Sequence, residues 1–334
     1  MSTTHRQHGG LGLLLALALW LFALGSPPVL AQADPAAAQV ERQQTQPLNN
    51  APVWREVRSG EEHFTTVRGP EAGVLIQSEG NTWRQWRNGP ITFYGGILLL
   101  VVPTAIGLFY AVKGAVKLHG KPTGRSMQRF NLFERIVHWG TAISFVVLAI
   151  TGTMILFGRY VIEPVFGNAV LGGLLWAGKG IHNYLGPVFA VFTLLMILAF
   201  LRDNVWQAID SVWIRKAGGL VSGEHVPSGR FNFGEKTWFW IGVTFLGLVV
   251  AGSGLVMDFP NFGQTRADMQ LANIIHGVGA IVLIALSLGH IYMGTIGVEG
   301  AYQSMKTGHV DETWAKEHHQ FWYDEVKAGR SGRP

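Results

Sequence analysis

Five long runs of apolar residues dominate the pattern of hydrophobic and polar positions, and none of them contains Asp, Glu, Lys or Arg. A transmembrane helix needs about 20 apolar residues to cross a hydrocarbon layer of about 30 Å. Because every run reaches this length, the pattern predicts an all-α integral membrane protein. The expected spans cover residues 91–112, 136–158, 181–201, 238–257 and 271–297.

A shorter apolar stretch, LGLLLALALWLFALG, lies near the N-terminus between Arg6 and the small-residue segment VLAQA. A basic residue, a short apolar core and alternate alanines are together typical of a signal peptide. We therefore predict a signal peptide at 1–33, with an uncleaved anchor as the alternative. Residues 34–60 are rich in Gln, Ala, Pro and Asn, and the whole segment 34–90 is predicted to be a periplasmic extension.

The distribution of Lys and Arg between the runs predicts the orientation of the chain. The links 113–135 and 202–237 and the tail 301–334 hold most of the basic residues, whereas the links 159–180 and 258–270 hold three between them. The positive-inside rule places the first group in the cytoplasm. An exported N-terminus followed by five spans gives the same answer. The expected localisation is the bacterial inner membrane, with the mature N-terminus in the periplasm and the C-terminus in the cytoplasm.

Charge and cysteine content narrow the function further. The net charge of +5 is compatible with nucleic-acid binding, but the basic residues lie mostly between the apolar runs, where topology explains them better. No nucleic-acid partner is therefore expected. The sequence has no cysteine, which excludes disulfides, thiolate-bound iron–sulfur clusters and a cysteine nucleophile in this chain. Any metal must be held by nitrogen or oxygen ligands.

Four histidines belong to the predicted spans. His138 and His182 open the second and third spans, and His276 and His290 lie near opposite ends of the fifth. The last two are fourteen positions apart, so both project from one face of a helix, about 21 Å apart along its axis. On the predicted topology the histidines form two pairs by depth. The outer pair is His182 and His276, and the inner pair is His138 and His290.

Three interpretations of these pairs compete. A histidine near a helix end often hydrogen-bonds a neighbouring helix and has a purely structural role. A proton relay normally brings Asp or Glu into the spans, and the five runs contain none. Haem b held between histidines of facing helices explains the pairing, the two depths and the uncharged surroundings together. Small residues beside the histidines would leave room for a macrocycle, although they also suit ordinary helix packing: Gly186, Gly277, Gly279, Ala280 and Gly289.

Four segments carry a resemblance to a known family, in the order RFNLFERIVHWGTAISFVVLAITG, GIHNYLGPVFAVF, GRFNFGEKTWFW and LANIIHGVGAIVLIALSLGHIYMGTIGVEG. From about residue 129 to 326 the chain resembles the gamma subunit, a dihaem cytochrome b, of membrane-bound respiratory formate dehydrogenase. The resemblance implies a four-helix bundle within 129–300 that binds two haems b. It also implies an iron–sulfur beta subunit as electron donor, an alpha subunit with molybdenum or tungsten, and quinone as acceptor. The helix at 91–112 and the segment before it are additional to the family pattern.

The resemblance also implies roles for individual residues. The outer pair and the inner pair each correspond to the axial ligands of one haem iron, so the chain conducts electrons and does not act on formate. Asn232 and Gly234 match an N-x-G pattern of the family's quinone site at the cytoplasmic end. An Asn amide can hydrogen-bond a quinone carbonyl, and Gly lets the ring approach the backbone. Asn232 followed by Glu235 also fits a helix capping box, and this alternative stays open.

Two alternative functions also stay open. The chain fits a cytochrome b subunit of another quinone-linked complex, such as a nickel–iron hydrogenase or a different molybdoenzyme, or a haem-free membrane anchor. The choice between ubiquinone and menaquinone is not encoded in any pattern above. The tail at 301–334 is expected to be an amphipathic segment on the membrane surface or beneath a partner. His318 and His319 within it are not expected to bind metal, because adjacent side chains point apart on a helix.

Overall fold

The computed structural model describes residues 55, 58, 59, 78–219 and 226–330. The chain divides into two compact units, Met1–Glu61 and Glu62–Pro334, and all the helices considered below belong to the second. The predicted signal peptide at 1–33 and most of the predicted extension at 34–90 lie outside the described residues.

The first long helical stretch is the additional one predicted from the apolar run at 91–112. It consists of α4 (Ser78–Trp86), a π-helical turn (Arg87–Ile91) and α5 (Thr92–Lys113). This stretch packs along α11 (Arg266–Tyr292). Gly95 makes that packing close, because a Cβ atom there would lie 2.5 Å from Cδ1 of Ile281. Near the other end of the contact, the Trp83 indole donates a hydrogen bond of 3.0 Å to Asn273 Oδ1.

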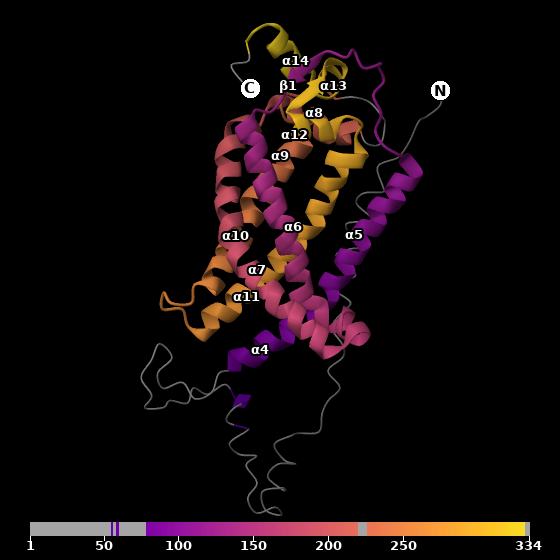
Figure 1. Ribbon diagram of the computed structural model, residues 1–334. Helices are drawn as coiled ribbons and strands as arrows, with labels where there is room; N and C mark the ends of the chain where they lie inside the picture. Colours follow the sequence, from indigo (N-terminus) through magenta and orange to yellow (C-terminus); the bar gives the residue numbers. More distant parts are fainter. Residues whose placement is uncertain (1–54, 56–57, 60–77, 220–225, 331–334) are drawn as a thin grey trace, which may run out of the picture. The chain divides into compact units, whose positions relative to one another are not determined.

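Four further helical stretches form the helix bundle shown in Figure 1. Close packing joins α6 (Leu132–Val161) to α7 (Glu163–Phe200), α7 to α10 (Gly247–Asp258), and α10 to α11. A π-helical segment, Trp238–Leu246, leads directly into α10. All five stretches are long and apolar enough to cross a membrane. The predicted all-α architecture, a four-helix bundle with one additional N-terminal helix, is therefore confirmed.

Helix α7 is much longer than the predicted span at 181–201. The segment 159–180, expected to be a link outside the membrane, is mostly helical from Glu163 onward. Its helix bends at Gly167, whose φ of 77° and ψ of 170° are accessible to glycine at little cost. Charged Lys179 interrupts the apolar run without interrupting the helix, because backbone hydrogen bonding depends little on side-chain polarity.

Short elements gather at the end of the bundle that carries the inner pair, here named the inner end (Figure 1). Strands β1 (Ser126–Gln128) and β2 (His309–Asp311) pair antiparallel, with Met127 opposite Val310. The remaining elements are a 3₁₀ turn Leu201–Asn204, α8 (Ala208–Arg215), a 3₁₀ turn Ala217–Gly219, α9 (Phe233–Thr237), a π turn Met293–Gly297, α12 (Ala301–Thr307), α13 (Glu312–His318) and α14 (Gln320–Lys327).

The C-terminal tail forms a core of its own. Met127 from β1 packs with four buried residues of the tail: Val310, Trp314, Ala315 and Trp322. The tail therefore folds against β1, and its buried apolar side chains pack within this chain. This differs from the expected single amphipathic segment, since the described part of the tail forms three short helices and one short strand, β2, which pairs with β1.

Candidate functional site

The outer pair joins two helices that are not closely packed. His182 on α7 and His276 on α11 face each other with ring centroids 6.1 Å apart and ring planes at 77°. Each ring lies over a glycine of the helix next to its own. A Cβ atom would lie 3.3 Å from His182 Cε1 at Gly152 on α6, and 3.1 Å from His276 Cε1 at Gly254 on α10.

Hydrogen bonds determine which nitrogen of each outer ring carries the proton. The Thr151 hydroxyl can donate to the Val147 carbonyl at 2.9 Å, and its oxygen, 2.8 Å from His182 Nδ1, can then accept a proton from that nitrogen. The Val250 carbonyl can only accept, so His276 Nδ1 donates to it at 2.9 Å. The carbonyl fixes the proton on Nδ1 of His276, and the Thr151 hydroxyl suits the same tautomer of His182. Their Nε2 lone pairs are left to bind a metal.

The inner pair has different neighbours. His138 on α6 and His290 on α11 face each other with ring centroids 6.3 Å apart and ring planes at 56°. Trp238 stacks on His290 at 4.7 Å and 11°, while Trp139 lies edge-on to His138 at 5.3 Å. His138 Nδ1 is buried and has no hydrogen-bond partner among the described residues. Aromatic contacts therefore take the place of the hydrogen bonds found around the outer pair.

Both pairs fit the two axial positions of a haem iron. Two imidazoles on opposite sides of one metal ion bring their ring centroids to about 6 Å, given metal–nitrogen bonds of about 2 Å. Helix α11 carries one histidine of each pair, yet within the described residues it makes no extensive backbone packing with α6 or α7. None of the four side chains is buried, and that of His290 is exposed. Open space next to Gly186 and Gly289 adds room beside the histidines.

Asn232 and Gly234 lie at the inner end, just before Trp238. Asn232 caps α9: its Oδ1 accepts from the Glu235 backbone N–H at 3.0 Å, and the Glu235 carboxylate accepts from the Asn232 N–H at 2.9 Å. The capping box is therefore present. It uses Oδ1 of Asn232 and not Nδ2, which is the atom that would donate to a quinone carbonyl. Gly234 allows Trp213 to approach, because a Cβ atom would lie 3.0 Å from Trp213 Cη2.

Comparison with known proteins assigns the bundle to a family. The family model described as prokaryotic cytochrome b561 matches residues 129–308. The chain belongs to this family. Membership implies haem b binding and electron transport, and together with the five apolar helices it makes this cytochrome b561 family member a multi-pass membrane protein.

Three curated proteins with similar sequences are named as formate dehydrogenase cytochrome b556 subunits. The formate dehydrogenase cytochrome b556(fdo) subunit of Escherichia coli K12 is 31% identical over 203 residues, which cover 60% of this chain and 92% of the relative. The nitrate-inducible formate dehydrogenase cytochrome b556(Fdn) subunit of the same strain is 29% identical over 206 residues, 91% of its length. The formate dehydrogenase cytochrome b556 subunit of Haemophilus influenzae is 26% identical over 196 residues, 79% of its length.

The family domain contains a short motif that occurs twice. RFNLFER begins at Arg129 and RFNFGEK begins at Arg230, so each copy places an Arg, an Asn cap and a Glu at the same spacing. Both copies begin a helix of the bundle with the same capping box. Self-comparison of the sequence would find this signal, and it indicates that α6–α7 and α9–α11 are two similar helical hairpins.

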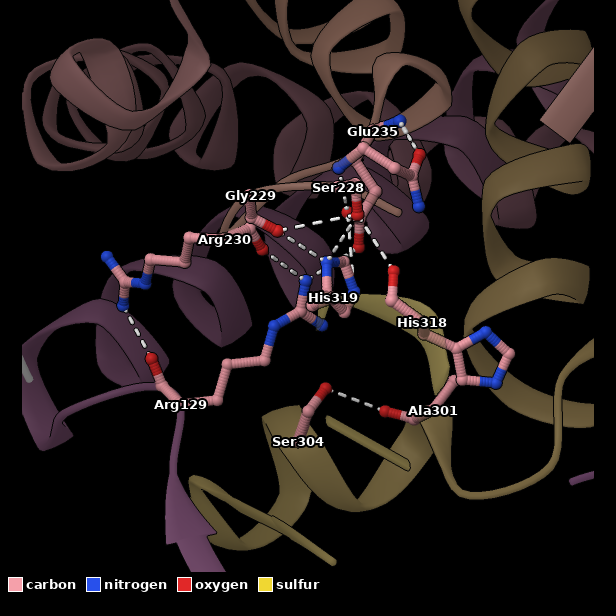
Figure 2. Close-up of polar contacts among 10 residues, drawn as sticks. Arg129, Ser228, Gly229, Arg230, Glu235, Ala301, Ser304, His318 and His319 are labelled. Carbon is pink, nitrogen blue, oxygen red and sulfur yellow. Dashed lines mark hydrogen bonds and ion pairs between the residues drawn. The ribbon is translucent and has the colours of Figure 1, made fainter. Parts of the chain in front are cut away.

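The two copies exchange their ion pairs across the inner end. Arg129 Nη2 lies 2.9 Å from Glu235 of the other copy, and Arg230 Nη2 lies 2.7 Å from Glu134. Each guanidinium also donates to the backbone carbonyl of the other arginine, at 2.8 and 2.6 Å (Figure 2). Burial lowers the pKa of Arg129. Burial also opposes the charge of Arg230, but the carboxylates of Glu134 and Asp203 outweigh it and raise that pKa.

His319 joins this exchange from the tail (Figure 2). Its Nδ1 donates to the Gly229 carbonyl at 2.8 Å, and the Ser228 hydroxyl lies 3.1 Å away. Burial, followed by the positive charge of Arg129, lowers the pKa of His319 to about 3. The imidazole is therefore neutral at pH 7, and its 3.9 Å approach to Glu235 is not an ion pair under those conditions.

Proposed function

We infer that this chain is the cytochrome b subunit of a respiratory formate dehydrogenase and carries electrons through two haems b to quinone. The observation that supports this most directly is the presence of two facing histidine pairs, one towards each end of the bundle, with ring centroids 6.1 and 6.3 Å apart. The curated relatives, which are named as formate dehydrogenase cytochrome subunits, supply the donor. The domain concerned is 129–300, and 91–112 is an additional transmembrane helix.

His182 and His276 hold the outer haem, and His138 and His290 hold the inner one. A haem iron held by each pair would supply one-electron transfer, and its two imidazole ligands would leave no position for oxygen. Thr151 and the Val250 carbonyl keep the outer imidazoles in the tautomer that a metal requires. The chain therefore contributes ligands and an apolar surround for electron transfer, and it contains no formate chemistry.

The charge pattern orients the complex in the bacterial inner membrane. The basic links favour an orientation with the inner end and the C-terminus in the cytoplasm and the N-terminal extension in the periplasm. An iron–sulfur beta subunit then delivers electrons from the molybdenum- or tungsten-containing alpha subunit to the outer pair. Quinone accepts them at the inner end, beside Asn232 and Gly234. Each electron that moves inward through 100 mV corresponds to about 2.3 kcal/mol.

Replacement of one histidine from each pair tests this function. We expect His276→Ala to lose the outer haem and His290→Ala the inner one, because each leaves an iron with a single axial ligand. His309→Ala, in the exposed part of the tail, is the matched control and should keep both. The measurements are the haem-to-protein ratio and the reduced-minus-oxidised spectrum of the purified protein.

Three outcomes would contradict the proposal. Absence of any b-type spectrum in the parent protein would leave a haem-free anchor as the function. Two haems in both histidine variants would show that the pairs are not the ligands. In native membranes, formate should reduce both haems; reduction by hydrogen alone would instead indicate a hydrogenase partner.

A further inference from the structure

The two histidine pairs differ in what lies opposite Nδ1. In the outer pair, His182 meets Thr151 on α6 and His276 meets Ser253 on α10, at 2.8 and 3.4 Å. Both hydroxyls come one residue before the glycine on which the ring lies. The two helical hairpins thus offer the same hydroxyl–glycine pair to equivalent histidines.

These hydroxyls act as acceptors towards the rings. Thr151 donates its proton to the Val147 carbonyl at 2.9 Å, and Ser253 donates its proton to the Val249 carbonyl at 2.6 Å. A hydroxyl has only one proton to donate, so its oxygen lone pairs are what it presents to Nδ1–H. His276 has a second, shorter acceptor, the Val250 carbonyl at 2.9 Å. His182 has Thr151 as its only described hydrogen-bond partner.

The inner pair has no equivalent arrangement. His138 Nδ1 is buried without a hydrogen-bond partner among residues 78–219 and 226–330. Its partner, His290, is held by ring stacking on Trp238, and stacking does not draw on the Nδ1 proton. The acceptors are therefore concentrated on one of the two pairs.

An acceptor at Nδ1–H makes an imidazole a stronger electron donor to its metal and so favours the oxidised iron. We propose that Thr151, and to a smaller extent Ser253, are positioning residues that keep the outer haem at a lower reduction potential than the inner haem. This inference rests on the proposed function, because it requires the histidine pairs to be the ligands. Its consequence is that electrons move downhill from the outer pair to the inner pair.

Redox titration of purified variants, followed by absorbance, tests the inference. Thr151→Val removes the acceptor at nearly constant shape, and it should raise the reduction equilibrium constant of the lower-potential haem about tenfold, or about 59 mV for one electron. Thr151→Ser keeps the hydroxyl and should restore the parent value. Thr153→Val is the matched control: its hydroxyl bonds the Ala149 and Ile150 carbonyls of the same helix and touches no histidine.

Ser253→Ala provides a second, graded test. The Val250 carbonyl still accepts from His276 in this variant, so the shift should have the same sign as that of Thr151→Val and be smaller. Repeating the titration in a His290→Ala background, which retains only the outer haem, identifies the component that moves. That single haem should titrate at the lower of the two parent potentials.

Three results would overturn the inference. One is an outer haem that titrates at the higher parent potential. Another is a Thr151→Val protein that keeps both haems but titrates like Thr153→Val. The last is a Thr151→Val protein that loses a haem while Ser253→Ala shows no shift. Failure of the proposed function looks different, since the parent protein would then show no pair of b-type components to titrate.

Discussion

The outer and inner ends of the bundle orient their paired imidazoles through different interactions. Around the outer pair, hydroxyls and a backbone carbonyl orient the imidazoles, and the partners come from the uncharged interiors of α6 and α10. Around the inner pair, aromatic rings orient the imidazoles, and a buried exchange of ion pairs holds the surrounding helix starts together. The difference shows that a symmetrical pair of hairpins has two chemically distinct ends.

Depth in the membrane explains part of this difference. Charged groups are expensive in the apolar interior, whereas Ser and Thr can satisfy their hydroxyls on the carbonyl of the preceding turn and still offer lone pairs to a ring. At the inner end the chain leaves the apolar helices, and the helix starts supply capping carboxylates that can pair with arginine. Stability at the inner end should therefore depend on charge, and at the outer end on neutral hydrogen bonds.

The largest expected effect is at the inner end. Arg230→Ala removes the cation that pairs with Glu134, whose side chain is only 5% exposed, and it also removes the ion pair with Asp203. Breaking a buried pair from one side costs about 3–5 kcal/mol. If the two pairs hold haem as proposed, thermal denaturation in detergent should release the inner haem well before the outer haem.

Arg125→Ala is the control for this substitution. Arg125 also pairs with a carboxylate, Glu312 at 3.0 Å, but its side chain is 71% exposed. A pair with one exposed member contributes about 0–1 kcal/mol. The buried carboxylate of Glu312 also keeps a second cation, Lys327, so this variant should denature nearly like the parent. Equal losses in the two variants, or simultaneous release of both haems from Arg230→Ala, would remove the distinction between the two ends.

A smaller effect should appear as a pH dependence. The pKa of buried His319 is lowered from 6.5 to about 3, so below pH 6.5 the unfolded chain takes up a proton that the folded chain does not. The stability linked to this residue is complete above pH 6.5 and decreases as the pH falls from 6.5 towards 3. Near pH 5 the loss is about 2 kcal/mol.

His319→Asn should reduce this pH dependence, because an Asn amide can still donate to the Gly229 carbonyl but does not titrate. His309→Asn, at an exposed position of the tail, should leave it unchanged. The measurement is the thermal midpoint of each purified protein at pH 7 and pH 5. Identical pH dependence in the parent and the His319 variant would contradict the neutral, buried imidazole.

The smallest effect on stability separates the two roles of Asn232. Asn232→Asp keeps the cap on α9 but loses the Nδ2 donor, whereas Asn232→Ala loses both, at a cost of about 1 kcal/mol. If quinone binds there, both variants keep two formate-reducible haems and reduce quinone slowly. Asn131→Asp, in the equivalent cap of α6, should reduce quinone normally. Normal quinone reduction by both Asn232 variants would locate the quinone site elsewhere.

Much of the architecture was predictable because membrane spans have strong local signals. Long uncharged runs predict the helices, and the spacing of His276 and His290 predicts two depths on one helix. The helical segment after Glu163 was not predictable in this way, since its charged and glycine residues resemble a link. The folded tail was also missed, because the partner of its core, Met127, lies far away in the sequence.

The sequence by itself determined the helices, the positions of the histidines along them and the two copies of the RFN motif. The sequence did not decide which arginine pairs with which glutamate, because each copy of the motif contains one arginine and one glutamate. Packing of the two hairpins decided this, by bringing Arg129 to Glu235 and Arg230 to Glu134. The acceptor for His182 was decided in the same way: many hydroxyls lie in these helices, and only the rotation of α6 against α7 turns Thr151 towards the ring. Local hydrogen bonding and hydrophobicity follow from residues that are close in the sequence, whereas contacts between helices depend on how the helix faces pack against each other.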